Sequence, residues 1–143
     1  MSFEIRPLPI DPSRLNGLSE RLIVSHHENN YSGAVKRLNA IREKLASVDF
    51  TQEPGFAING LKREELIAYN SMVLHELYFA ALGGDGELAQ GELHSAIERD
   101  FGSAARWRSE FTAMGKALAG GSGWVLLVWS PRDGRLSNHW ASD

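Results

Sequence analysis

The chain has no cysteine, so it contains no disulfide bond, no thiolate metal ligand and no thiol nucleophile. Any metal ion must therefore be bound by His, Asp, Glu or solvent, and these donors suit manganese, iron or zinc better than soft metals. No apolar run is long enough to cross a bilayer, and residues 1–10 show no signal-peptide pattern. We therefore expect a cytoplasmic protein with no membrane partner.

An excess of positive charge is also missing. Lys and Arg number 15 against 18 Asp and Glu, which gives a net charge of −3, and no basic stripe predicts contact with nucleic acid. The 143 residues, 43% of them hydrophobic, are enough for one compact domain or for two small layers that share a core.

Two long helical patterns fill the first part of the chain. The first pattern has spacings of three and four, which place its members on one helix face: Leu18, Leu22, His26, Asn30, Ala34, Leu38, Ile41 and Leu45. Gly33 interrupts it, and we expect this glycine to mark a bend or a point of close packing. After a loop that includes Gly60, a second helix is predicted over residues 61–82. A single connecting loop favours an antiparallel helical hairpin.

Shorter elements follow the hairpin. A helix is predicted over residues 88–100, and another begins after Ser103, whose hydroxyl suits an N-cap. Residues 124–129 form a buried strand candidate. An Asp-Gly pair then predicts a hairpin turn and a returning strand over residues 135–141.

These elements predict an α+β fold class. An N-terminal helical hairpin domain, residues 1–86, is followed by an α/β domain, residues 87–143, whose helices pack on a small antiparallel sheet. A two-stranded sheet is marginal by itself and leaves exposed edges, so we expect the second domain to be incomplete and its sheet truncated.

Two of the five histidines occupy positions that the hairpin can bring together. His26 lies on the apolar face of the first helix, and His75 lies midway along the second. Facing helices build metal sites from such side chains, and neutral imidazole is a common metal ligand. A histidine on an apolar face is more often a hydrogen-bonded core residue, so spacing alone leaves both interpretations open. His27 is one residue off the face and is expected to point elsewhere.

Several stretches of the sequence resemble iron/manganese superoxide dismutases. The matching stretches are residues 22–39 with His26-His27 and Leu38-Asn39, Ala-Ile-Glu-Arg-Asp-Phe-Gly-Ser at 96–103, Phe111, and Gly-Ser-Gly-Trp at 121–124. The resemblance implies one redox-active iron or manganese ion that converts superoxide to dioxygen and hydrogen peroxide. It also implies a homo-oligomer, either a dimer or a tetramer.

The resemblance assigns roles to individual residues. It places His26 and His75 at the first two metal-ligand positions and Trp124 among the residues that line the metal pocket. It implies no catalytic residue in this chain beyond the metal ligands.

The sequence departs from the family pattern around this pocket. The family has a His four residues after the first ligand and a Tyr eight residues after it, and these positions hold Asn30 and Ala34. Tyr31 is close in sequence but lies about 100° around an α-helix from Asn30, so we do not expect it to substitute. Ser71 replaces the glutamine that iron enzymes place four residues before the second ligand, so the sequence does not separate iron from manganese.

The family takes an Asp and a His ligand from an Asp-x-Trp-Glu-His segment near its C-terminus, and no such segment appears before Asp143. We therefore expect little dismutase activity from these residues alone. Three interpretations remain at this point: a dismutase whose sequence is truncated here, which we favour; a catalytically inactive dismutase-like scaffold or interaction protein; and a metal-binding protein with different chemistry.

Overall fold

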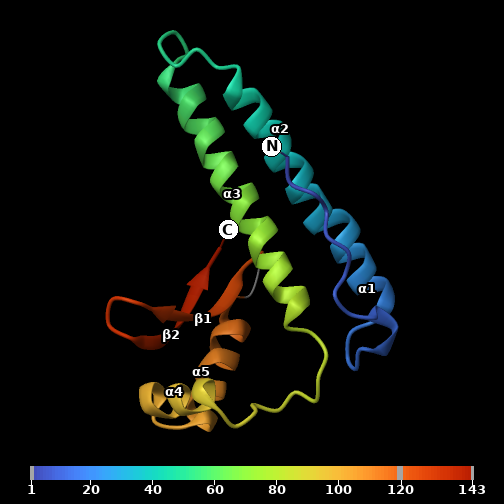
Figure 1. The fold of residues 1–143 in the computed structure, drawn as a ribbon, viewed down its shortest axis with the longest axis vertical. Coiled ribbons are helices and arrows are strands. Elements are labelled where there is room, and N and C mark those ends of the chain that lie inside the picture. The colour runs from blue at the N-terminus through green and yellow to red at the C-terminus, as the bar shows by residue number, and fades with distance from the viewer. Residues whose placement is uncertain (1, 119–120, 143) are drawn as a thin grey trace. The chain divides into compact units, whose positions relative to one another are not determined.

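The computed structural model describes residues 2–118 and 121–142, and the chain divides into two compact units, Met1–Asp85 and Gly86–Asp143 (Figure 1). The first unit is helical, and the second combines two helices with a two-stranded antiparallel sheet. The predicted α+β fold class is therefore confirmed. Among the described residues, no helix has both the length and the apolar character needed to cross a membrane.

The first helical segment of unit one is made of three consecutive parts. Helix α1 (Glu20–Ser25) begins at Ser19, whose hydroxyl accepts the backbone N–H of Leu22 at 3.2 Å and acts as an N-cap. A π-helical turn, η2 (His26–Tyr31), follows, and α2 (Ser32–Ala46) continues from it. In the π-turn the backbone N–H of Ser32 reaches back five residues to the carbonyl of His27, so the turn contains one residue more than an α-helix would.

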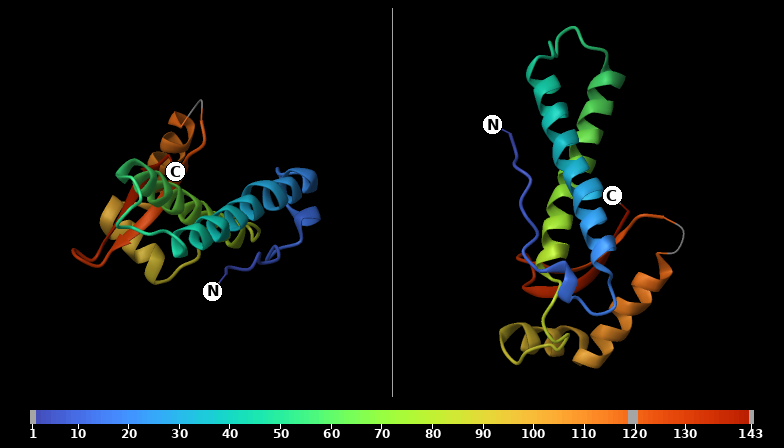
Figure 2. Two further views of the ribbon diagram at one scale, coloured as in Figure 1. Left: turned by 90° about the horizontal axis from the view of Figure 1, so that it is seen from above. Right: turned by 90° about the vertical axis from the view of Figure 1, so that its right-hand side faces the viewer.

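Helix α3 (Gly55–Ala80) runs antiparallel to α2 and packs along it, so the predicted helical hairpin is present (Figures 1 and 2). The core between these helices consists of buried residues from both: Ile23, Tyr31, Val35, Leu38, Ala68, Met72 and Phe79. The start of α3 was predicted six residues too late, because Gly60 lies inside the helix. Pro54 holds φ at −60° just before the first turn and fits a helix start, and the cost of one interior glycine is small against a 26-residue packed helix.

The expected bend or close packing at Gly33 is wrong. A Cβ atom at Gly33 would meet nothing within 4 Å, and the irregularity of the helix lies just before it, in the π-turn. The prediction of a single buried face is also wrong on the N-terminal side of this turn. The extra residue shifts the helical register, so Ile23 is fully buried there while Leu22 is 52% exposed.

A strap of extended chain, residues 2–11, precedes a short 3-10 turn, η1 (Pro12–Arg14), and lies along the hairpin (Figure 2). The backbone N–H of Phe3 donates to Asn39 Oδ1 at 2.8 Å, and Asn39 Nδ2 donates to the carbonyl of Phe3 at 2.9 Å. The strap is therefore attached to α2 by a pair of hydrogen bonds that resembles the pairing of two strands.

The second unit contains helices α4 (Glu92–Phe101) and α5 (Ala104–Ala117). Helix α4 starts four residues later than predicted, because its N-cap is Gly91, which holds a φ of +154° that favours glycine. The predicted cap of α5 is confirmed, since Ser103 Oγ accepts the backbone N–H of Arg106 at 3.1 Å.

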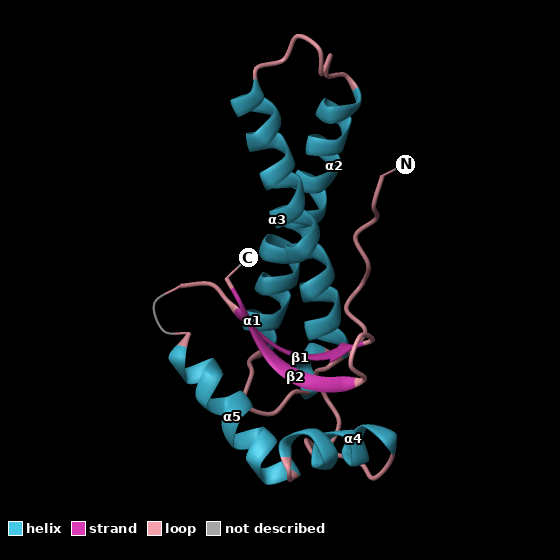
Figure 3. Cartoon of the chain, turned by 90° about the vertical axis from the view of Figure 1, so that its left-hand side faces the viewer, coloured by secondary structure: helices cyan, strands magenta, loops and turns pink. Residues whose placement is uncertain are grey.

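Strands β1 (Trp124–Ser130) and β2 (Arg135–Ala141) form the antiparallel hairpin (Figure 3). Their register pairs Trp124 with Ala141 at one end and Ser130 with Arg135 at the other. The returning strand matches its predicted bounds.

Side chains join the helices of this unit to β2. Asp100 accepts the backbone N–H of Leu136 at 2.8 Å, and Trp107 Nε1 donates to Asn138 Oδ1 at 3.1 Å. The helices therefore pack on the sheet, as the fold class requires.

Candidate metal centre

The two histidines singled out in the sequence meet across the helical hairpin. His26 is the first residue of the π-turn, and His75 is a buried residue of α3, 6% exposed. Their Nε2 atoms lie 3.0 Å apart, and the two rings are nearly perpendicular, with centroids 4.8 Å apart. The sequence therefore predicted correctly that the hairpin can bring these side chains together, and it left open whether they bind a metal.

The backbone of α3 fixes the tautomer of His75. Its Nδ1 lies 2.6 Å from the carbonyl oxygen of Ser71, one turn earlier, and 3.3 Å from the Ser71 hydroxyl. A carbonyl oxygen can only accept a hydrogen bond, so Nδ1 carries the proton and the unprotonated Nε2 accepts a hydrogen bond from Nε2–H of His26. The hydrogen bond from Nδ1 is the arrangement that usually orients metal-ligating histidines.

Both imidazoles have a pKa below the ordinary value of 6.5. Burial is the main cause for each, and the neighbouring His75 lowers the pKa of His26 further. The hydrogen bond to the Ser71 carbonyl partly opposes the lowering at His75. The pair is therefore neutral at neutral pH, which is the protonation state that binds metal ions.

Aromatic rings surround the histidine pair. The ring centroids of Tyr78 and Phe79 each lie 5.5 Å from that of His26, and Phe79 lies 6.1 Å from His75. The ring centroid of Tyr31 lies 6.5 Å from that of His75. These rings displace water and lower the local dielectric constant, which strengthens any electrostatic interaction at the imidazoles.

The π-turn decides which residues of the first helix reach this region. Tyr31 was not expected to substitute for the family's pocket residues on α-helical spacing, but the π-turn brings this residue, five positions after His26, round to the same side. Tyr31 is 1% exposed and packs on His75, whereas Asn30 is exposed. Ala34 is buried in α2, 8% exposed, and contributes only a methyl group.

The hydroxyl of Tyr31 is held from two directions. It donates to Glu76 Oε1 at 2.9 Å and accepts the backbone N–H of Arg6 at 3.0 Å. Burial raises the pKa of Tyr31, and the carboxylate of Glu76 adds to this while the N–H of Arg6 opposes it. Tyr31 therefore remains a protonated donor at neutral pH.

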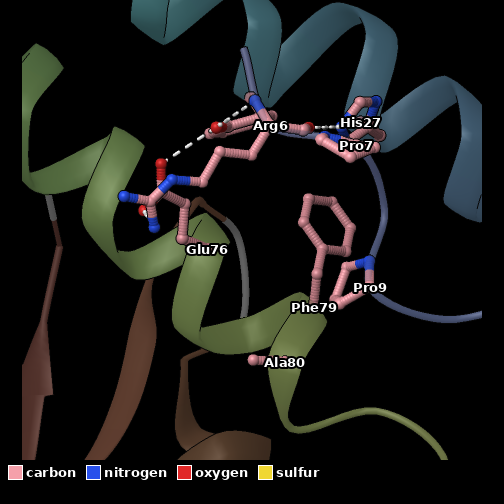
Figure 4. Close-up of a pocket in the computed structure, with 8 residues that line it drawn as sticks. Arg6, Pro7, Pro9, His27, Glu76, Phe79 and Ala80 are labelled. Atoms are coloured by element: carbon pink, nitrogen blue, oxygen red, sulfur yellow. Dashed lines mark hydrogen bonds and ion pairs between the residues drawn. The ribbon is translucent and has the colours of Figure 1, made fainter. Parts of the chain in front are cut away.

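A cavity of about 160 Å³ lies beside this network in unit one (Figure 4). Its lining combines the strap, the π-turn and α3: Arg6, Pro7, Pro9, His27, Tyr31, Glu76, Phe79 and Ala80. His27 does not point to His75, since its Nε2 lies 2.8 Å from the carbonyl oxygen of Arg6. Tyr31 and Phe79 line the cavity and also lie beside His75, so the cavity and the surroundings of the histidine share these two rings.

Of the residues predicted for the site, the first unit brings together His26, His75, Ser71 and Tyr31. Trp124 belongs to the second unit, where it is partly buried at the start of β1. Sequence reasoning missed Arg6 and Glu76. Glu76 could have been found because it directly follows His75 in the sequence. Nothing in the sequence links Arg6 to Glu76, which is 70 positions away.

The candidate centre consists of the histidine pair alone within the described part of the chain. Over residues 2–118 and 121–142, no group of three or more His, Asp or Glu side chains lies close enough to hold an ion together. Two imidazole nitrogens leave the other coordination positions of a metal to water or further donors.

Comparison with known proteins identifies the family. Residues 89–143 match the family described as iron/manganese superoxide dismutases, C-terminal domain. The chain is 66% identical over 143 residues to a superoxide dismutase (Fe) of Cupriavidus metallidurans, covering 100% of this chain and 72% of that protein. It is 32% identical over 142 residues to superoxide dismutase (Mn) 2 of Haloferax volcanii, covering 96% of this chain and 68% of the relative.

The superoxide dismutase (Fe) of Aquifex pyrophilus is 37% identical over 134 residues, which are 89% of this chain and 61% of that protein. The chain belongs to the iron/manganese superoxide dismutase family.

Proposed function

We propose that the protein is a superoxide dismutase, which converts two superoxide anions and two protons to dioxygen and hydrogen peroxide, with one iron or manganese ion bound in part by His26 and His75. The observation that carries the proposal is the 3.0 Å approach of the two Nε2 atoms from facing helices. Family membership, with relatives named as iron and as manganese enzymes, supports both the reaction and the metal.

The residues present fit such an ion. His75 already has its proton on Nδ1, so its Nε2 needs no deprotonation to ligate, while His26 would have to give up the Nε2 proton that it now donates to His75. When bound, the metal supplies the one-electron chemistry by alternating between two oxidation states. Imidazole nitrogens are suitable ligands for iron. Water or carboxylate oxygens in the remaining positions are suitable for manganese, so the donors are compatible with either ion.

The chain's own residues then have defined tasks. Ser71 holds the ring of His75 through its backbone carbonyl, which keeps the ligand orientation fixed. Tyr78 and Phe79 exclude water from the imidazoles. At the edge of the cavity, the hydroxyl of Tyr31 donates its proton to Glu76 and accepts the backbone N–H of Arg6.

The experiment that tests the proposal measures metal content and superoxide consumption of the full-length protein. We expect about one equivalent of iron or manganese and rapid superoxide loss. His75→Gln should remove both, whereas His94→Gln, the same substitution on α4 of the other unit, should change neither. A wild-type protein without metal and without activity would instead support the scaffold interpretation.

We also infer a cytoplasmic location and a homo-oligomer, a dimer or tetramer, with superoxide as substrate and no nucleic-acid partner. The family resemblance supports the oligomer, and the absence of cysteine and the net charge of −3 support the location and the lack of nucleic-acid binding. Light scattering after gel filtration and cell fractionation test these points. A monomer, or recovery in the membrane fraction, would contradict them.

A further inference from the structure

We propose that Tyr31 is a positioning residue for the histidine pair: its hydroxyl, clasped between Glu76 and the backbone of Arg6, holds the π-turn that carries His26 against the turn of α3 that carries His75. The inference rests on the proposed function of this site, because it concerns how the two metal-binding side chains are kept in register.

The clasp connects three elements that are far apart in the sequence. Tyr31 comes from the π-turn. Glu76 comes from α3 and Arg6 from the N-terminal strap (Figure 4). The Tyr31 hydroxyl donates to Glu76 Oε1 at 2.9 Å, and the Arg6 guanidinium donates to Glu76 Oε2 at 2.9 Å. Each carboxylate oxygen of Glu76 therefore accepts from a different element.

The strap contributes mainly through its backbone. The N–H of Arg6 donates to the Tyr31 hydroxyl at 3.0 Å, and the carbonyl of Arg6 accepts from His27 Nε2 at 2.8 Å. Both partners belong to the π-turn, so one strap residue holds its second and its last position. The side chain of Arg6 is 74% exposed, and its ion pair with Glu76 is therefore a minor part of the clasp.

The clasped residues are the immediate neighbours of the candidate ligands. His27 follows His26, Glu76 follows His75, and the ring of Tyr31 packs on the ring of His75 with centroids 6.5 Å apart. A shift of Glu76 or His27 therefore moves a ligand-bearing backbone directly. Metal ligands tolerate displacements of only about 0.5 Å before affinity suffers.

The burial of Tyr31 makes its hydroxyl consequential. Tyr31 is 1% exposed and Glu76 has 23% of its side chain exposed, so Tyr31→Phe removes a buried donor from a partly buried carboxylate oxygen. The π-turn also contributes, because it directs the ring of Tyr31, with its polar hydroxyl, inward at the fifth position after His26.

A purely structural role for the clasp gives a different expectation. Asn39 anchors the same strap at its other end through two hydrogen bonds to Phe3, and it lies in α2, eight residues beyond the last residue of the π-turn. If the strap only stabilises the hairpin, losing either anchor should have the same effect on the histidines. If Tyr31 positions them, only loss of the clasp should matter.

The test titrates the metal-free full-length protein with Co²⁺, followed by visible absorbance, and records the imidazole NMR signals before metal is added. The variants are Tyr31→Phe, Glu76→Ala, Glu76→Gln and the control Asn39→Ala. We expect Tyr31→Phe and Glu76→Ala to weaken Co²⁺ binding roughly tenfold and to shift the His26 and His75 signals. Glu76→Gln, which keeps an oxygen acceptor for Tyr31, should restore most of the affinity, and Asn39→Ala should lower the melting temperature without either change.

Two outcomes would overturn the inference: Tyr31→Phe binding Co²⁺ as wild type does with unchanged imidazole signals, or Asn39→Ala weakening Co²⁺ binding as much as Tyr31→Phe. Failure of the wild-type protein to bind Co²⁺ would contradict the proposed function instead. In that case the imidazole signals of the metal-free variants still decide whether Tyr31 sets the geometry of the pair.

Discussion

The carbonyl oxygen of Ser71 lies 2.6 Å from Nδ1 of His75, closer than the hydroxyl of the same serine at 3.3 Å. The orientation of the imidazole is therefore set by the main chain of α3 rather than by the side chain at position 71. The side chain at position 71 can therefore change without altering the tautomer of His75.

The first prediction follows from that geometry. Ser71→Ala removes the hydroxyl but leaves the helical carbonyl in place, so we expect Co²⁺ affinity to change less than about threefold, below the range typical of losing an outer-shell hydrogen bond. Titration of the metal-free variant measures this. A tenfold loss would show that the hydroxyl, not the carbonyl, orients His75.

The second prediction concerns pH. His26 and His75 have pKa values lowered below 6.5 by burial, so the unfolded chain binds more protons than the folded one as the pH falls below that value. Stability of the metal-free protein is therefore fully present above pH 6.5 and declines toward pH 5. Melting temperatures across this range should fall, and the fall should be smaller in His75→Gln than in His94→Gln, which retains both buried imidazoles. Equal slopes in the two variants would contradict the assignment.

The third prediction tests the helical register produced by the π-turn. Ile23 is fully buried in the hairpin core and Leu22 is 52% exposed. Ile23→Ala should lower the free energy of unfolding by about 2–4 kcal/mol, because it leaves a cavity, whereas Leu22→Ala should cost less than about 1 kcal/mol. Urea unfolding of both variants gives the comparison. The reverse order would mean that the face predicted from α-helical spacing is correct.

The fourth prediction concerns the second unit. Arg99 and the backbone N–H of Leu136 hold the pKa of Asp100 at about 2, below its ordinary 3.8. Its ionised form therefore stabilises the fold above pH 3.8, and this contribution disappears as the pH falls through about 2. Asp100→Asn should lower the melting temperature at pH 7 and have much less effect near pH 2. Glu92→Gln, at the start of the same helix, is the control, and a pH-independent effect of Asp100→Asn would contradict the assignment.

The sequence was informative where local chemistry decides the structure. Ser103 caps α5 because its hydroxyl satisfies a free N–H at a helix start, and this signal does not depend on tertiary contacts. The Asp-Gly turn set the returning strand for the same reason, with Gly134 at a φ of +66°. The approach of His26 to His75 followed from helical spacing and one short connection.

The rest of the site depended on features that spacing rules do not include. A π-turn adds one residue without any characteristic composition, so α-helical spacing wrongly placed Leu22 on the buried face and gave no reason for Tyr31 to contact His75. The late prediction of α3 came from treating Gly60 as a helix stop, although tertiary packing outweighs its weak preference. Arg6 joined the site only through chain folding, which no local pattern encodes.

The paired hydrogen bonds between Phe3 and Asn39 also constrain how this chain tolerates substitution. Asn39 offers both a donor and an acceptor to the main chain of position 3, as a peptide group would. These two hydrogen bonds therefore do not depend on the side chain at position 3. Aspartate lacks the donor and leucine lacks both groups. Variation at position 3 is thus limited by the packing of its ring on Tyr69 and beneath the guanidinium of Arg42, whereas position 39 admits few alternatives to an amide.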